Sequence, residues 1–263
     1  MIVEKSFQTE SGTLNYAEGS NSGPPLVLLH GITADWNSFM PLFATLSQRW
    51  HIYAPDFRGH GKSSSVPGQY RLVDYAEDIT QFIRSTFDKP PAIFGHSLGG
   101  MVGILVAAHH PELARALIVG DSLLYKETLS EFQPNSIEEQ QNIIRSISSV
   151  DEMAEAISTR EPTQSGAWHR YVANSYTNLD ADILELFCDF GEEYDCASLF
   201  PKIICPVLLL QSALLTDEDV EKAIAQLSKG YFAKFDGMGH ELHLEPGGYQ
   251  VVTEICLFLE SLR

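Results

Sequence analysis

PAIFGHSLGGMVGILVAA, residues 91–108, joins a short apolar strand to an apolar helix through a glycine-rich turn. The apolar run PAIFG (91–95) is typical of a strand buried on both faces of a parallel sheet. The turn itself, GHSLG (95–99), matches the pattern G-x-S-x-G. Glycines on either side of the turn indicate that a larger side chain would collide with the strand or the helix. We therefore expect Ser97 to adopt a strained backbone conformation, with its hydroxyl projecting as a nucleophile requires.

Strands alternate with helices before and after this stretch. Further strands are predicted at 3–9, 13–18, 26–30, 51–56, 115–121, 206–211 and 231–236. Helical spacing of apolar residues predicts helices at about 39–49, 70–87, 217–228 and 248–262. Alternation of this kind predicts an α/β fold with a mostly parallel, doubly wound sheet of eight strands.

The alternation is interrupted between the sixth and seventh strands. Residues 122–200 show helical patterns without strand signals, and one of these helices opens with a capping-box pattern from Ser149 to Glu152. We therefore predict an α/β core made of residues 1–121 and 201–263. Residues 122–200 are predicted to form an all-helical cap inserted after the sixth strand.

The chain is strongly acidic, with 17 lysines and arginines against 35 aspartates and glutamates and a formal net charge of −18. A surface of this sign repels nucleic acids and anionic membranes, so neither is expected as a partner. It favours a neutral or apolar small molecule as the substrate. The composition does not distinguish a monomer from a homodimer.

Several patterns that would change this picture are missing from the sequence. No apolar run is long enough to span a bilayer, and residues 1–12 lack the basic and apolar regions of a signal peptide. The four cysteines include no C-x-x-C pair, so we expect free thiols and a cytoplasmic protein. No metal-ligand spacing and no phosphate-binding loop occurs, so no metal ion or other cofactor is predicted.

Four motifs make the chain similar to a known family. In chain order they are His30-Gly31, DFRGHGKS (56–63), GHSLGG (95–100) and GMGHELHLEP (237–246). With these motifs the chain resembles the α/β-hydrolase fold superfamily over essentially its whole length, and within it the small, capped, esterase-like and lactonase-like members. The resemblance implies a catalytic serine, acid and histidine in that chain order. Serine at the turn, in place of aspartate, argues against epoxide-hydrolase or dehalogenase chemistry.

A serine nucleophile needs a base within hydrogen-bonding distance, and the chain has nine histidines. His240 follows the last predicted strand in a glycine-rich loop, where the resemblance places the base. We therefore predict Ser97 as the nucleophile and His240 as the base. His30 and His60 belong to motifs that order loops in this family, and His243 is expected to pack or to line the pocket.

The acid that orients the histidine has two candidates. In most relatives it follows the penultimate strand, within PVLLLQSALLTDED (206–219), but Leu215 occupies the expected position. Asp217 comes two residues later, where Thr216 and three successive acids are typical of a helix N-terminus. Asp121, at the end of the sixth strand, is the position that some members use. We favour Asp121 and keep Asp217 as the alternative. A third possibility is a site of Ser97 and His240 alone, in which a water molecule or a backbone group takes the place of the acid.

The remaining site residues follow from the resemblance and from the aromatic side chains. The resemblance implies that the backbone N–H groups of Ile32 and Leu98 bind the oxyanion. Aromatic residues near the turn and in the cap are expected to build a mostly apolar pocket. Those predicted to contact the substrate are Trp36, Tyr125 and Trp168.

Together these residues predict a serine hydrolase that cleaves a small, mostly apolar ester or lactone through an acyl-enzyme. The same serine and histidine also suit a carbon–carbon bond hydrolase or a perhydrolase. A third interpretation is a receptor that turns over a signal molecule slowly. Fast turnover of short acyl esters, lost in Ser97→Ala, distinguishes the enzyme from the receptor.

Overall fold

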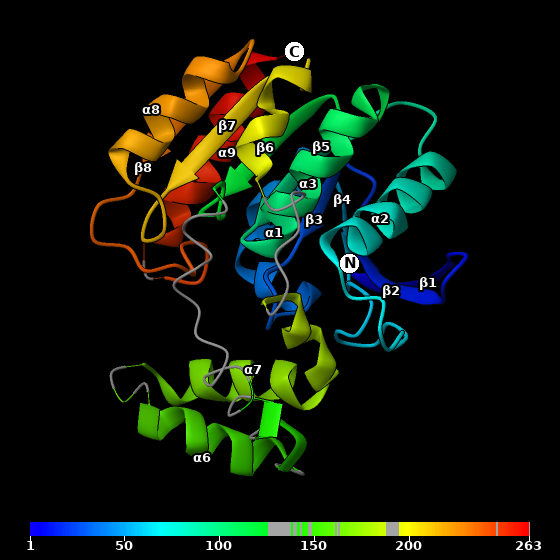
Figure 1. The fold of residues 1–263 in the computed structure, drawn as a ribbon, viewed down its shortest axis with the longest axis vertical. Coiled ribbons are helices and arrows are strands. Elements are labelled where there is room, and N and C mark those ends of the chain that lie inside the picture. The colour runs from blue at the N-terminus through cyan, green and yellow to red at the C-terminus, as the bar shows by residue number, and fades with distance from the viewer. Residues whose placement is uncertain are drawn as a thin grey trace.

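A mixed eight-stranded sheet forms the centre of the molecule (Figure 1). The computed structural model describes residues 1–125, 138, 141–142, 144–146, 149–160, 162, 164–187, 195–245 and 247–262. Within them the strand order is β1-β2-β4-β3-β5-β6-β7-β8. The strands are β1 (Val3–Gln8), β2 (Thr13–Glu18), β3 (Pro25–Leu29), β4 (His51–Pro55), β5 (Ala92–His96), β6 (Ala116–Gly120), β7 (Val207–Gln211) and β8 (Gly230–Lys234). Only the pairs β1–β2 and β2–β4 are antiparallel among these strands, which confirms the mostly parallel sheet expected from the sequence.

Helices cover both faces of the sheet. α1 (Met40–Leu46) and α9 (Gly248–Ser261) pack on one face. α2 (Leu72–Thr86), α3 (Leu98–His109) and α8 (Asp217–Gln226) pack on the other. The doubly wound arrangement is thereby confirmed, and it encloses one apolar cluster on each face of the sheet.

The central strands are buried on both faces. Along β3, Leu26 and Leu28 belong to the cluster beneath α1 and α9, whereas Val27 and Leu29 belong to the cluster beneath α3, as the two-residue period of a strand requires. Burial of each such side chain contributes about 1.5–3 kcal/mol. Eleven of the 12 residues of α3 are buried too, which explains why its sequence is apolar on every side. A helix enclosed in this way has a fixed N-terminus, and Ser97 lies there.

The turn between β5 and α3 has the strained geometry that its sequence predicts. Ser97 has φ 51° and ψ −118°, a conformation that few residues other than glycine adopt. A Cβ atom on Gly95 would lie 2.1 Å from the carbonyl oxygen of Gly99. A Cβ atom on Gly99 would lie 2.1 Å from the carbonyl oxygen of Leu29, in the neighbouring strand. Both glycines are therefore required by close backbone contacts, which confirms the expectation from the sequence.

Replacing Gly99 by alanine is expected to destabilise the fold by about 3 kcal/mol or more, because strand and helix must separate to admit the methyl group. Chemical denaturation followed by circular dichroism measures the loss. Gly166→Ala is the matched control: Gly166 opens α7 (Gly166–Thr177), and a Cβ there meets no atom within 4 Å. That variant should equal the wild type or gain up to about 1 kcal/mol. Equal stability of Gly99→Ala and wild type would contradict the close contact.

The described part of the segment between β6 and β7 is helical. It contains α6 (Val150–Arg160), α7, and two 3₁₀ helices, η3 (Ala181–Phe187) and η5 (Cys196–Lys202). Figure 1 shows α6 and α7 side by side and standing away from the sheet. This segment is the helical cap inserted after the sixth strand, as predicted.

The cap is joined to the core by apolar packing, since Leu124, Ile183 and Leu184 belong to the same buried cluster as α2 and α3, and by polar contacts. The backbone N–H of Asp180 donates to the carbonyl of Gly59 over 2.8 Å, and its carboxylate accepts a hydrogen bond from the Tyr70 hydroxyl over 2.5 Å. The division into a core (1–121 and 201–263) and a cap (122–200) stays a prediction. η5 runs across its second boundary, and Phe200 belongs to the cluster beneath α3.

The described helices and cysteines bear on membrane insertion and on disulfide formation. None of the helices there has both the length and the apolar composition that a bilayer crossing requires. Cys196, Cys205 and Cys256 form no disulfide with one another, and Cys188 lies outside the described residues. Burial raises the pKa of the Cys205 thiol to about 11, so this side chain behaves as a small apolar group.

Candidate active site

Ser97 lies where three elements meet. It caps α3 at the end of β5, and its backbone N–H donates to the carbonyl of Gly120 in β6 over 2.9 Å. The loop after β3 passes beside it, since a Cβ on Gly31 would lie 3.5 Å from the Cβ of Ser97. Leu98 opens α3, so its N–H is one of those that a helix leaves without an intrahelical acceptor.

The loop after β8 brings His240 to this corner. The carbonyl of His240 accepts a hydrogen bond from Nε2 of His96 over 2.9 Å, and the two rings are 4.7 Å apart. The hydroxyl of Ser212 donates to the carbonyl of Gly239 over 3.0 Å. His240 is thus held against the residue that precedes Ser97.

Asp121 is the partner of His240. Its Oδ2 lies 2.8 Å from Nδ1 of His240. Nδ1 therefore carries the proton, and Nε2 is left with a free lone pair. Asp121 is fully buried and has φ 41°, so its backbone, like that of Ser97, is in an unusual conformation at the end of a central strand.

Backbone N–H groups of the loop after β7 surround the Asp121 carboxylate. Ser212 donates to Oδ1 over 3.0 Å, Ala213 to Oδ2 over 3.3 Å, and Leu214 to both oxygens over 3.1 and 3.2 Å. Burial alone would raise the pKa of Asp121, but His240 and these N–H groups lower it below its ordinary value. The carboxylate is therefore ionised at neutral pH.

The pKa of His240 is shifted in the opposite direction. Burial lowers it, but the hydrogen bond to Asp121 and the charges of Glu241 and Asp121 outweigh burial, so the pKa lies above the ordinary value of 6.5. The environment thus stabilises the protonated imidazole, which is the form that a general base must reach during the reaction.

Asp217 lies elsewhere. Its Oδ1 accepts hydrogen bonds from Nζ of Lys234 over 2.6 Å and from Nε2 of Gln211 over 2.8 Å. It occupies the exposed first turn of α8, behind a capping box in which the side chains of Thr216 and Asp219 cap each other's backbone. Of the two candidate acids, the structure brings Asp121 and not Asp217 to His240.

The loop that carries Ile32 is ordered by two buried histidines. Nε2 of His60 lies 2.5 Å from the carbonyl oxygen of Ile32, and its Nδ1 lies 2.8 Å from that of Arg58. Nε2 of His30 accepts a hydrogen bond from the N–H of Phe57 over 3.0 Å. Both rings hold backbone in place, the role expected for these motifs.

The three aromatic residues predicted to contact the substrate have other partners. The indole N–H of Trp36 donates to Glu4 of β1 over 2.9 Å. The hydroxyl of Tyr125 donates to the carbonyl of Asp219 over 3.0 Å. Trp168 is half-buried on α7. None of these contacts is with Ser97 or His240, and the role of the three residues in substrate binding stays a prediction.

A cavity of about 680 Å³ lies between core and cap. Its lining comes from both: Asn37, Met40, Pro41, Val150, Ala167, Arg170, Tyr171, Asn174 and Leu244. Leu244 is four residues beyond His240, so this cavity adjoins the catalytic loop. Tyr171 is a wall residue of this cavity, and it is not one of the three aromatic residues predicted to contact the substrate. Its phenol is buried, and this burial raises its pKa.

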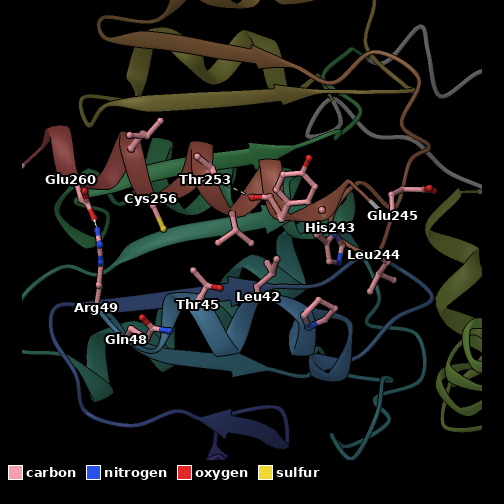
Figure 2. A pocket seen from close by; sticks show the side chains of 15 residues that line it. Leu42, Thr45, Gln48, Arg49, His243, Leu244, Glu245, Thr253, Cys256 and Glu260 are labelled. Atoms are coloured by element: carbon pink, nitrogen blue, oxygen red, sulfur yellow. Dashed lines mark hydrogen bonds and ion pairs between the residues drawn. The ribbon is translucent and has the colours of Figure 1, made fainter.

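A second groove, of about 580 Å³, lies between α1 and α9 (Figure 2).

Comparison with known proteins places this geometry in a family. The family model for the alpha/beta hydrolase fold matches residues 24–246. A curated relative, the 2-(acetamidomethylene)succinate hydrolase of Mesorhizobium japonicum, is 31% identical over 179 residues, which cover 68% of this chain and 58% of that protein. The chain thus spans less than two thirds of the length of this relative.

Solved structures agree on the fold. A structure of E-2-(acetamidomethylene)succinate hydrolase superposes with a TM-score of 0.78 at 22% identity, over 99% of this chain and 100% of that one. The enol-lactonase of Burkholderia xenovorans LB400 gives a TM-score of 0.77 at 18% identity, over 97% and 100%. These relatives are hydrolases to which this chain is similar in sequence or in fold. This chain belongs to the alpha/beta hydrolase fold family.

Proposed function

We propose that the chain is a serine hydrolase that cleaves a small, neutral ester or lactone through an acyl-enzyme. The observation that carries the proposal is the 2.8 Å contact between Asp121 and His240, held beside the turn that presents Ser97. A serine, a histidine and a buried acid at the carboxyl ends of strands in one sheet are the components of this chemistry.

The reaction proceeds in two halves. Nε2 of His240 removes the proton of the Ser97 hydroxyl while Oγ of Ser97 attacks the substrate carbonyl carbon. The N–H groups of Ile32 and Leu98 stabilise the oxyanion. The tetrahedral intermediate collapses, His240 returns the proton to the leaving alcohol, and an acyl-Ser97 ester remains. Water, deprotonated by His240, then attacks this ester and releases the carboxylic acid and free Ser97.

Charge in the described part of the cap favours a neutral substrate. Arg145 pairs with Asp182, and Arg170 pairs with Asp151 over 2.5 Å. These cations are therefore already matched by carboxylates, and the net charge of −18 opposes an anion further. The side chains of the other two cap cations, Lys126 and Arg160, lie outside the described residues. We therefore propose that the substrate carries no carboxylate groups, unlike the succinate derivative after which the Mesorhizobium japonicum relative is named.

A substrate panel tests the proposal. p-Nitrophenyl esters of increasing acyl length, neutral lactones and 2-(acetamidomethylene)succinate are compared by kcat/KM, with Ser97→Ala as the blank. We expect the neutral esters or lactones to be the best substrates. Faster cleavage of the dicarboxylate would overturn the assignment of substrate class while leaving the serine mechanism intact. Very slow turnover of every ester, with a ligand-induced rise in Tm, would indicate a receptor instead.

The pH dependence follows from the raised pKa of His240. The base must be neutral to accept the serine proton, so activity is lost as the pH falls through its pKa. We expect the acidic limb of kcat/KM to have its midpoint above 6.5, the ordinary value for histidine. A pH series on wild type measures it, with the rate of Ser97→Ala subtracted. In Asp121→Asn the limb should move to lower pH, because the charge that favours imidazolium is gone. An unshifted limb would show that another group controls the profile.

A further inference from the structure

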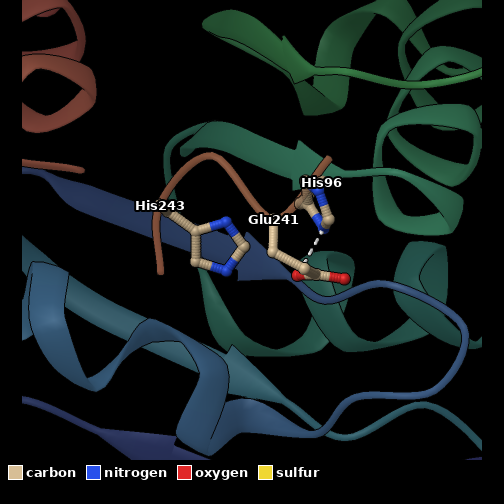
Figure 3. Close-up of side chains that lie close together, drawn as sticks. All are labelled: His96, Glu241 and His243. Atoms are coloured by element: carbon tan, nitrogen blue, oxygen red, sulfur yellow. Dashed lines mark ion pairs between the residues drawn. The ribbon is translucent and has the colours of Figure 1, made fainter. Parts of the chain in front are cut away.

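Three side chains near His240 form a cluster of residue types that bind metal ions. His96 comes from the end of β5, and Glu241 and His243 come from the loop after β8 (Figure 3). One ligand atom from each lies within 4.8 Å of the other two, and Nδ1 of His96 is 3.8 Å from Oε2 of Glu241. No metal-ligand spacing is visible in the sequence because His96 is 145 residues before Glu241 in the chain.

Three ring nitrogens in this cluster are buried without a hydrogen-bond partner among the described residues: Nδ1 of His96, and Nδ1 and Nε2 of His243. Both rings are 1% exposed. Leaving a buried polar atom unsatisfied costs about 1–3 kcal/mol. One ion between the rings can bind Nδ1 of His96 and one of the two nitrogens of His243, which would give a partner to two of the three.

The hydrogen bonds around His96 determine which of its nitrogens is free to bind. Nε2 donates its proton to the carbonyl of His240 over 2.9 Å, so Nδ1 carries the lone pair and faces Glu241. A histidine ligand whose other N–H is held by a backbone carbonyl is the usual arrangement at metal sites. Burial lowers the pKa of His96 and His243 to about 3, so both rings are neutral, as metal ligands must be.

The surroundings allow an ion to enter and the ligands to close on it. His243 lines one end of the groove between α1 and α9, beside Leu244 and Glu245 (Figure 2). Zn²⁺ binds nitrogen and oxygen ligands at about 2.0–2.2 Å, so tetrahedral ligands are about 3.4 Å apart. The ligand atoms, which all lie within 4.8 Å of one another, would move closer together around an ion, and the Glu241 side chain is 33% exposed whereas both rings are buried.

We propose that His96, Glu241 and His243 form a binding site for one divalent transition-metal ion of the zinc class. Two imidazoles and one carboxylate are a ligand set that Zn²⁺ prefers, with the fourth position open to water. The bound ion would tie the loop after β8 to the end of β5. The site adjoins the proposed catalytic residues, since His96 precedes Ser97 and Glu241 follows His240, but its test by metal binding does not depend on the hydrolytic function proposed above.

Calorimetric titration of the chelator-treated full chain with Zn²⁺ tests the site. We expect one equivalent to bind and to raise Tm, and Co²⁺ in its place to give the visible absorption of a tetrahedral centre. Glu241→Gln and His243→Phe should each weaken Zn²⁺ binding by at least about tenfold. Phenylalanine suits the stacking of His243 on Phe39, whose rings are 5.2 Å apart. Should His243→Phe fail to fold, the partly exposed Glu241 position carries the test.

His109→Ala is the control for binding to surface histidines, because His109 is exposed at the end of α3. Its affinity for Zn²⁺ should equal that of the wild type. The proposal is overturned if the wild type binds no Zn²⁺, or if Glu241→Gln and His243→Phe bind it as tightly as the wild type does. It is also overturned if His109→Ala alone loses the binding.

Discussion

Ser97→Ala is expected to lower kcat for ester hydrolysis by at least about 10⁴-fold while the fold stays intact. The alanine keeps the backbone of the turn and removes only the hydroxyl oxygen, so no acyl-enzyme can form. Binding and the oxyanion donors remain, which is why a residual rate above that of water is expected. Steady-state kinetics on a p-nitrophenyl ester measures the loss, and mass spectrometry of wild type quenched during turnover should show the acyl group on Ser97.

Ser122→Ala is the matched control for this variant. Ser122 is fully buried at the same edge of the sheet, and its hydroxyl donates to the carbonyl of Gly120 over 3.2 Å. Its loss removes one internal hydrogen bond, worth about 1 kcal/mol, and should leave the rate within a few-fold of wild type. If Ser97→Ala behaved like Ser122→Ala, the serine mechanism would be wrong.

Asp121→Asn is expected to reduce kcat by about 10⁴-fold. The amide can accept N–H bonds through its oxygen, but its NH₂ group then faces Nδ1 of His240 or the N–H groups of residues 212–214. If the NH₂ group faces His240, it donates to Nδ1 and favours the tautomer in which Nε2 carries the proton, and that tautomer cannot accept the proton of Ser97. The opposite orientation keeps the proton on Nδ1 but sets the NH₂ group against the backbone N–H groups of residues 212–214, which is unfavourable because all of these groups are donors. Circular dichroism and Tm establish that the variant is folded before its rate is measured.

Asp217→Asn serves as the control because it removes the same charge from the alternative acid position. It breaks a 2.6 Å ion pair with Lys234 at the exposed start of α8, and ion pairs as exposed as this one contribute little to stability. Its kcat should stay within about twofold of wild type. Near-full activity in folded Asp121→Asn, together with a collapse in Asp217→Asn, would reverse the assignment of the acid.

Much of the fold follows from local patterns in the sequence. The strands at the centre of the sheet are short and wholly apolar because both of their faces are covered, and α3 is apolar throughout because it is enclosed. Glycines at 95 and 99 are required by contacts of their own backbone with the nearest elements. These features depend on neighbouring residues in the chain or on burial of a whole element, and both can be predicted from one sequence.

The candidate site was predictable only in part. Leu215 occupies the usual acid position, which favoured another place for the acid, and the family resemblance supplied Asp121, a position that some members use. What the sequence could not show is the role of residues 212–214, which act through backbone N–H groups that any residue but proline supplies. The walls of the cavity were equally hidden, because the position of Tyr171 depends on how the cap packs on the core.

The attachment of the cap has a consequence for protein engineering. The inserted segment leaves the sheet at the end of β6 and returns at β7, and these two strands are paired neighbours, about 4.8 Å apart. Asp121 also donates its N–H to the carbonyl of Leu210 over 2.8 Å, directly across that gap. Because β6 and β7 are parallel, the insertion leaves at the carboxyl end of β6 and returns at the amino end of β7, where Val207 pairs with Leu117. The bond between Asp121 and Leu210 lies at the other end of β7, so the sheet fixes the acid independently of the point where the insertion returns. The closure entropy of a long loop depends only weakly on its length, so caps of other lengths are expected to be accepted without displacing the acid.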